Sequence, residues 1–133
     1  MKFKIISPKL FVYNLYNLYK SYKKTPKLTI NQDGTKYWEL PNGKLHREDS
    51  PAVEHTNGTK YWYIDNELHR EDGPACEYSG GGKWWYLNGQ LHRENGPAIE
   101  YRYGDKEWYI NGIEYSEEEY KYEMRSKKLE KLL

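Results

Sequence analysis

The residues of this chain that can do chemistry are gathered in a His-Arg-Glu segment that occurs three times. The copies are His46-Arg47-Glu48, His69-Arg70-Glu71 and His92-Arg93-Glu94. Imidazole and carboxylate groups can ligate a metal ion or transfer protons, so each copy is a candidate ligand set or acid–base pair. Each copy follows the previous one by 23 residues. A fixed period in this range indicates stacked supersecondary units.

A shared metal site is excluded by the geometry of such a stack. Equivalent residues of successive hairpin rows lie at least two strands apart, on the order of 10 Å. A zinc ion needs each ligating nitrogen at about 2 Å. His46, His69 and His92 therefore cannot hold one ion together, and the arginine inside each copy repels a cation. We predict no metal site and no cofactor.

Catalysis is equally poorly supported by the surroundings of the histidines. No serine or cysteine nucleophile accompanies them, and no glycine-rich phosphate loop precedes a helix. The run Gly80-Gly81-Gly82 falls in register with a hairpin turn. Residues that recur once per repeat build a stack, whereas an active site is normally built once. We predict no catalytic residues and a protein that is not an enzyme.

A structural role explains the repeated segment better. Arg70 is expected to pair with Glu71, with Glu77 or with an acid of a neighbouring row, and His69 to cap carbonyl groups at the bend. The alternative is a ligand-binding role, in which the repeated arginines line one edge of the sheet as an array beside exposed aromatic rings. Arginine together with tyrosine or tryptophan is typical of binding hot spots. That array would capture a small anionic ligand such as a nucleotide signal. Its members are Arg47, Arg70 and Arg93.

The elements that position these residues are β-hairpins. Short aromatic, β-prone runs such as residues 60–64 and 83–87 lie between turn dipeptides. We predict type I′ turns, with positive φ at both central residues, at these dipeptides. They are Asp33-Gly34, Asn42-Gly43, Asn57-Gly58, Asp65-Asn66, Asn88-Gly89 and Asn111-Gly112. Residues 28–115 are therefore predicted to form an elongated antiparallel sheet of about four tandem 23-residue hairpin repeats.

Alternation along these strands makes both faces of the sheet aromatic. Trp62 and Ile64 fall on one face, and Tyr61 and Tyr63 on the other. One face is expected to take covering helices and the other to stay partly exposed as a binding surface. The predicted binding aromatics are Tyr61, Tyr63, Trp84 and Tyr86.

Helices are predicted on both sides of the sheet. Residues 1–27 form a basic arm whose amphipathic helix, residues 8–24, ends before Pro26. We expect it to pack on the end or face of the sheet, the alternative being a membrane-surface or partner-binding helix. Ser116 and Glu119 form a capping-box pattern, so residues 116–133 are predicted to be a helix that caps the last sheet edge.

Charge and composition limit the partners. Residues 1–27 carry seven lysines and no acid, whereas residues 28–115 carry nine basic and fifteen acidic residues. The sheet is therefore a poor nucleic-acid surface, and the N-terminal arm is the place to look for such binding. No apolar run approaches the roughly 20 residues that span a bilayer. The single cysteine, Cys76, is expected to be a small buried hydrophobe in a cytoplasmic, reducing compartment.

The repeat unit resembles a known family. Residues 58–75 and 81–98 follow Gly-x-x-x-Trp-Tyr-x-Asn/Asp-Gly/Asn-x-Leu-His-Arg-Glu-Asp/Asn-Gly-Pro-Ala. This pattern is similar to the MORN-type repeat, in the variant of bacterial antitoxin-like, phage and giant-virus proteins. The resemblance covers residues 28–115, and residues 111–119 resemble the ending of phage versions. His-Arg-Glu replaces the usual His-Gly, so lipid binding proposed for MORN repeats does not transfer.

The resemblance implies a β-hairpin scaffold of viral or mobile-element origin. We therefore expect a protein–protein interaction module, a phage- or virus-encoded inhibitor or adaptor acting on a host defence protein in the host cytoplasm. Two alternatives stay open: a binding protein for a nucleotide signal, and a structural module that self-assembles into homo-oligomers.

Overall fold

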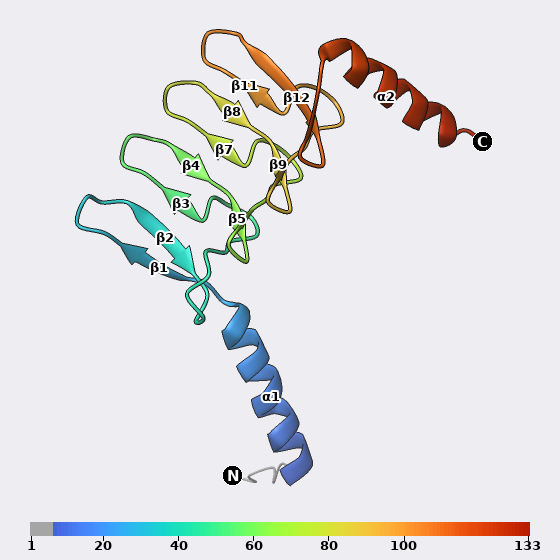
Figure 1. Cartoon of the computed structure of the whole chain (residues 1–133). Helices are drawn as coiled ribbons and strands as arrows, with labels where there is room; N and C mark the ends of the chain where they lie inside the picture. The colour runs from blue at the N-terminus through green and yellow to red at the C-terminus, as the bar shows by residue number, and fades with distance from the viewer. Residues whose placement is uncertain (1–6) are drawn as a thin grey trace.

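The structure is a computed structural model that describes residues 7–133, apart from the side chain of Lys23. Part of the predicted basic arm, including Lys2 and Lys4, lies outside the described residues. The chain is mainly β, with one helix at each end of the sheet region (Figure 1). The predicted mainly-β class with flanking helices is therefore confirmed.

Helix α1 (Pro8–Lys24) has the bounds that the sequence predicts. Its N-terminus is capped by Ser7, whose Oγ accepts a hydrogen bond from the Leu10 backbone N–H at 3.3 Å. Pro8 occupies the first turn, where its missing N–H costs nothing. Pro26 follows two residues after the last helical residue and prevents the helix from continuing.

A nine-stranded antiparallel sheet forms the body of the molecule, with the order β1-β2-β3-β4-β7-β8-β11-β12-β13. Within this order β1–β2, β3–β4, β7–β8 and β11–β12 are hairpins that lie side by side, and longer segments connect one hairpin to the next (Figure 1). The strands are β1 (Lys27–Ile30), β2 (Lys36–Glu39), β3 (Val53–Glu54), β4 (Lys60–Tyr61), β7 (Cys76–Glu77), β8 (Lys83–Trp84), β11 (Ile99–Glu100), β12 (Lys106–Ile110) and β13 (Ile113–Tyr115).

Two short hairpins extend from this sheet. One pairs β5 (Tyr63–Ile64) with β6 (Glu67–Leu68), and the other pairs β9 (Tyr86–Leu87) with β10 (Gln90–Leu91). The turns of these two hairpins and the turn between β12 and β13 are each tied to the preceding hairpin by a backbone hydrogen bond of 2.9 Å. The bonds run from Asn66 N–H to Leu45 O, from Gly89 N–H to Leu68 O, and from Gly112 N–H to Leu91 O.

A tryptophan and an alanine join each hairpin to the next. The Trp62 N–H donates to Ala75 O at 2.8 Å, and the Trp85 N–H donates to Ala98 O at the same distance. Trp38 makes the equivalent 2.8 Å bond to Ala52 O. All three alanines are fully buried, which leaves no room for a larger side chain where the chain crosses between rows.

The strand register sorts the side chains onto two faces, because opposed residues of neighbouring strands project the same way. One face, called the aromatic face here, carries the ladder Tyr37, Val53, Tyr61, Cys76, Trp84 and Ile99. The other, called the charged face, carries Lys36, Glu54, Lys60, Glu77, Lys83, Glu100 and Lys106. Lysine and glutamate thus alternate strictly across the charged face, an arrangement the aromatic pattern did not predict.

The predicted turn type is correct at three of the six dipeptides. Both central residues have positive φ at Asn88-Gly89, Asn111-Gly112 and Asp65-Asn66. At Asp33-Gly34, Asn42-Gly43 and Asn57-Gly58 only the glycine does, so a type I′ turn is wrong there. In these three loops the Asp or Asn side chain instead accepts from the backbone N–H two residues on, at about 3 Å.

Helix α2 (Glu117–Glu130) begins with the predicted capping box of Ser116 and Glu119. The helix contacts β12 and β13, and its one buried residue is Tyr120. The Tyr120 hydroxyl donates to Arg93 O at 2.8 Å and accepts from the Gly96 N–H at 3.0 Å. These bonds attach α2 to the loop that follows β10.

Helix α1 does not pack on the sheet, so that expectation was wrong. Its described side chains are all exposed, and Figure 1 shows it pointing away from the strands. The expectation that helices cover one sheet face also fails, because α2 meets only the last strands. A search of residues 7–133 found no helix with the length and apolarity needed to cross a membrane.

Replacing Gly89 by valine should destabilise the protein by about 1–3 kcal/mol, because a β-branched residue resists positive φ. Gly89 has φ +74°. The matched control is Gly80→Val, because Gly80 lies outside the left-handed region and has no atom within 4 Å of an added Cβ. Urea unfolding followed by tryptophan fluorescence measures both variants. Equal losses of stability would contradict the turn assignment.

Candidate functional site

Each repeated arginine stacks on the tryptophan of its own hairpin. The guanidinium carbon lies 3.9 Å from the ring centroid in Arg47–Trp38, 4.0 Å in Arg70–Trp62 and 3.7 Å in Arg93–Trp85. These distances place the cation directly over the ring face. The stack covers Trp62, which keeps only 8% of its surface exposed.

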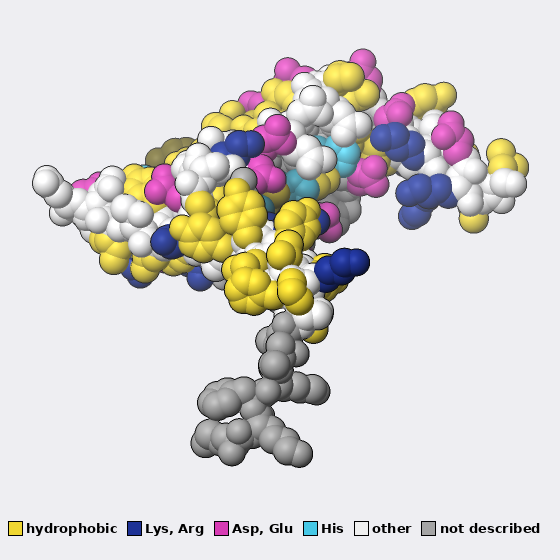
Figure 2. All heavy atoms as spheres, turned by 90° about the horizontal axis from the view of Figure 1, so that it is seen from below, with side chains coloured by type: hydrophobic (Ala, Val, Ile, Leu, Met, Phe, Trp, Pro, Cys, Tyr) yellow, Lys and Arg dark blue, Asp and Glu magenta, His cyan; other side chains and the backbone are white. Residues whose placement is uncertain are grey.

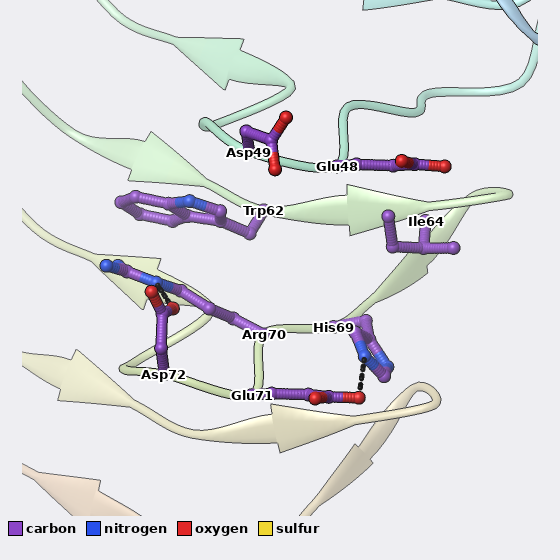
Figure 3. Close-up of a pocket in the computed structure, with 8 residues that line it drawn as sticks. All are labelled: Glu48, Asp49, Trp62, Ile64, His69, Arg70, Glu71 and Asp72. Atoms are coloured by element: carbon purple, nitrogen blue, oxygen red, sulfur yellow. Dashed lines mark hydrogen bonds and ion pairs between the residues drawn. The ribbon is translucent and has the colours of Figure 1, made fainter.

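The same guanidinium groups also hold the loop that follows them. Arg70 Nη1 donates to Pro74 O at 3.1 Å and to Glu77 Oε1 at 2.9 Å. Its Nε donates to Asp72 Oδ1 at 2.8 Å, a bond that Figure 3 shows. Arg70 thereby lowers the pKa of the Asp72 carboxyl. The predicted pairing with Glu77 is confirmed, whereas Glu71 lies 3.8 Å from His69 Nε2 instead.

The other two arginines make corresponding contacts. Arg93 Nη1 bonds Pro97 O at 3.0 Å and Glu100 Oε1 at 2.8 Å. Arg47 Nη1 bonds Pro51 O at 3.2 Å and lies 3.8 Å from Glu54 Oε1. Each arginine therefore joins its own tryptophan, the turn carbonyl four residues on and the glutamate seven residues on.

The repeated histidines accept hydrogen bonds rather than capping carbonyl groups, so that expectation was wrong. Nδ1 accepts from the Asp65 N–H at 3.2 Å in His46, from the Asn88 N–H at 3.1 Å in His69, and from the Asn111 N–H at 3.1 Å in His92. Each donor opens the turn of the next hairpin. The imidazoles accept these bonds because each positive-φ turn points the N–H of its first residue toward the preceding row, where the N–H needs an acceptor.

Shallow hollows lie between successive His-Arg-Glu loops. One of about 530 Å³ is lined by Trp62, Ile64, His69, Arg70 and four carboxylates, which Figure 3 shows on two separate loops: Glu48 and Asp49 on one, Glu71 and Asp72 on the other. A second, of about 890 Å³, is lined by His92, and His46 lines a third that lies between the first of these loops and the C-terminal end of α1. The three imidazoles thus face separate spaces, and no metal-binding group of three or more ligands occurs within residues 7–133.

The predicted aromatic residues form a cluster with one member that the sequence did not single out. Ring centroids are 6.5 Å apart in Tyr61–Tyr63, 5.8 Å in Tyr61–Tyr78 and 5.2 Å in Tyr78–Trp84. The edge-on geometry of the last two pairs is favourable for aromatic rings. Tyr78 could have been found by alternation, since it lies two residues after Cys76. The aromatic cluster is defined as Tyr61, Tyr63, Tyr78, Trp84 and Tyr86.

The cluster surrounds the buried thiol of Cys76, which is 1% exposed. Burial raises the pKa of this thiol to about 12, so the group is an inert core residue as predicted. Burial also raises the pKa of Tyr61, Tyr63 and Tyr86. All five cluster side chains nevertheless keep part of their surface in solvent.

The predicted binding residues therefore divide into two sets on opposite faces. Tyr61 and Trp84 lie on the aromatic face, whereas Arg70 reaches Glu77 on the charged face. The structure does not bring arginines and exposed tyrosines into one site. The arginine nitrogens are engaged within the fold, and the carboxylates of the adjoining hollow oppose an anionic ligand.

Comparison with family models, curated proteins and solved structures found no match to this chain.

Arg70→Met should destabilise the protein by about 2–3 kcal/mol, because the stack is lost and Glu77 loses its charged donor. Arg102→Met is the matched control. Arg102 is exposed and lies 5.5 Å from the Tyr103 ring, so its loss should change stability by less than about 0.5 kcal/mol. Urea unfolding compares the two, and a similar small effect at both positions would contradict the structural role.

The stability of the protein should fall as pH rises from about 9 to 12. The folded Cys76 thiol keeps its proton up to about pH 12, whereas the unfolded chain releases it near 9.0. The unfolded state therefore binds fewer protons in this window, and the raised pKa values of nearby tyrosines act with the same sign. Cys76→Val, which copies Val53 of the neighbouring row, should show a shallower fall in denaturation midpoint. Identical slopes would contradict this assignment.

Proposed function

We propose that this protein is a non-enzymatic scaffold that binds a partner protein through its aromatic cluster. The observation that carries the proposal is a group of large aromatic side chains that stays partly exposed on a sheet face that neither α1 nor α2 covers. Tyrosine and tryptophan are enriched at protein interfaces because they offer large contact area with few rotatable bonds.

The scaffold is best understood as tandem 23-residue units. The Trp–Ala backbone bond, the Arg–Trp stack and the histidine bond each occur three times at this spacing or within one residue of it. This recurrence supports the MORN-like interpretation of residues 28–115. If the resemblance to phage and giant-virus proteins holds, the partner is a host protein.

The charge of the sheet region indicates what kind of surface the partner presents. Residues 28–115 have a net charge of −6. A partner with basic residues around an apolar centre would therefore associate faster than an acidic one, since long-range attraction steers the encounter. Association should slow as salt is added.

Affinity capture with the full chain tests the proposal. Wild-type protein should retain one stoichiometric partner from lysate, and Tyr63→Ala combined with Tyr86→Ala should lose it. Both side chains belong to the aromatic cluster and sit in short hairpins at equivalent positions, 23 residues apart. Circular dichroism and the unfolding midpoint establish that the double variant is folded.

The matched control is Tyr103→Ala combined with Tyr122→Ala. These tyrosines are 87% and 73% exposed and lie outside the cluster, in the loop before β12 and on α2. They should retain the partner. A folded wild-type chain that retains nothing, or a partner lost equally with both double variants, would overturn the proposal. Light scattering that shows a homo-oligomer broken by the cluster variant would favour self-assembly instead.

A further inference from the structure

Helix α1 exposes a large apolar surface that the aromatic cluster and its proposed role do not use. Of its eight large hydrophobic side chains that are at least half exposed, seven share one side of the helix. They are Phe11, Val12, Leu15, Tyr16, Leu18, Tyr19 and Tyr22. Figure 2, which views the molecule of Figure 1 from below, shows hydrophobic side chains gathered in the middle of the visible face, with Lys or Arg groups beside them.

These seven residues lie on one side of the helix. At about 100° per residue they occupy an arc of roughly 160° of its circumference. The opposite side carries Asn14, Asn17, Ser21 and the lysines Lys9, Lys20 and Lys24, together with the exposed Leu10 and Tyr13. A helix with this division is stabilised mainly by burying its apolar side, because a helix of this length is only marginally stable in water.

Charge distinguishes the surfaces that could bury this side. The first 27 residues carry seven lysines and no acid. Two of the lysines lie against tyrosine rings, with Lys20 Nζ at 5.4 Å from the Tyr16 centroid and Lys27 Nζ at 5.4 Å from that of Tyr22. The amines thus lie beside tyrosines, side chains that favour the boundary between an apolar layer and water.

We propose that α1 is an interfacial helix that binds the surface of an anionic lipid bilayer with its axis along the membrane plane. An anionic bilayer supplies both an apolar layer for the seven hydrophobic side chains and negative headgroups for the lysines. Nucleic acid would satisfy the lysines but leave the apolar arc in water. A second α1 would bury the arc at the cost of bringing two all-basic arms together.

The shape of the molecule allows this contact. Figure 1 shows α1 extending away from the strands, so a flat surface can reach the helix without displacing the sheet. The sheet has the opposite net charge and is repelled by anionic headgroups. Binding would therefore hold the aromatic cluster off the membrane and leave it free for its partner.

Vesicle flotation with the full chain tests this proposal directly. The probes are phosphatidylcholine vesicles with and without about one third phosphatidylserine. The protein should float with the anionic vesicles, and its partition coefficient should fall at least about tenfold in neutral vesicles or in high salt. Helix content measured by circular dichroism should rise on addition of the anionic vesicles.

Two α1 variants and two matched variants at the C-terminal end of the chain locate the contact. Leu15→Glu with Leu18→Glu, and separately Lys20→Gln with Lys24→Gln, should each weaken binding at least about tenfold. Leu129→Glu with Leu132→Glu makes the same chemical change at exposed leucines near the other terminus, and Lys128→Gln with Lys131→Gln removes two lysines there. Both C-terminal variants should bind as the wild type does.

Several results would overturn the proposal. Folded wild-type protein that ignores anionic vesicles would do so, as would binding that the α1 variants leave unchanged. Binding of an oligonucleotide that survives Leu15→Glu with Leu18→Glu, without vesicle binding, would identify nucleic acid as the ligand. A dimer in light scattering that this variant abolishes would identify a second copy. The variant with both Tyr63→Ala and Tyr86→Ala should bind vesicles as the wild type does. A failure of vesicle binding can therefore be distinguished from a failure of partner capture.

Discussion

The stacking of arginine on tryptophan is the contact on which the rest of the sheet depends. In the second hairpin, one guanidinium touches the Trp62 ring, a turn carbonyl and the carboxylate of Glu77 on the following strand. A chain with few aliphatic residues has no deep apolar core, and this cation covers an aromatic ring that would otherwise face water. The arrangement explains how strands of only two residues stay in register, because the loop between rows is held at three points.

The two faces of the sheet have different physical characters. On the charged face, opposite charges alternate from Lys36 to Lys106, so each side chain has attractive neighbours on the adjacent strands. On the aromatic face, tyrosine rings pack around Val53, Cys76 and Ile99, which are nearly inaccessible. The surface that can exchange water for a partner at low cost is therefore the aromatic one, where few ions must be desolvated.

Local patterns in the sequence predicted local structure well. The bounds of α1, the capping box at Ser116 and the hairpin rows all follow from residues that are close together in the chain. The positions of the helices relative to the sheet did not follow, because nothing in the amphipathic pattern of α1 distinguishes a protein surface from another apolar surface. The charge ladder was missed because it depends on strand register, which the turn types determine, whereas Tyr78 was missed although alternation from Cys76 places it on the aromatic face. Half of those turns have a different geometry from the one predicted.

The histidine bonds give the stack a direction. Each imidazole accepts a hydrogen bond from the hairpin that comes after it, so the histidine of a row has its donor only when another row follows. At the end of the series the positions of histidine and arginine are taken by Tyr115 and Ser116, and Ser116 starts α2 instead of a further loop. Adding or removing a whole inner row would therefore preserve every histidine bond between rows. Truncation after an inner row would leave the last histidine without its N–H donor.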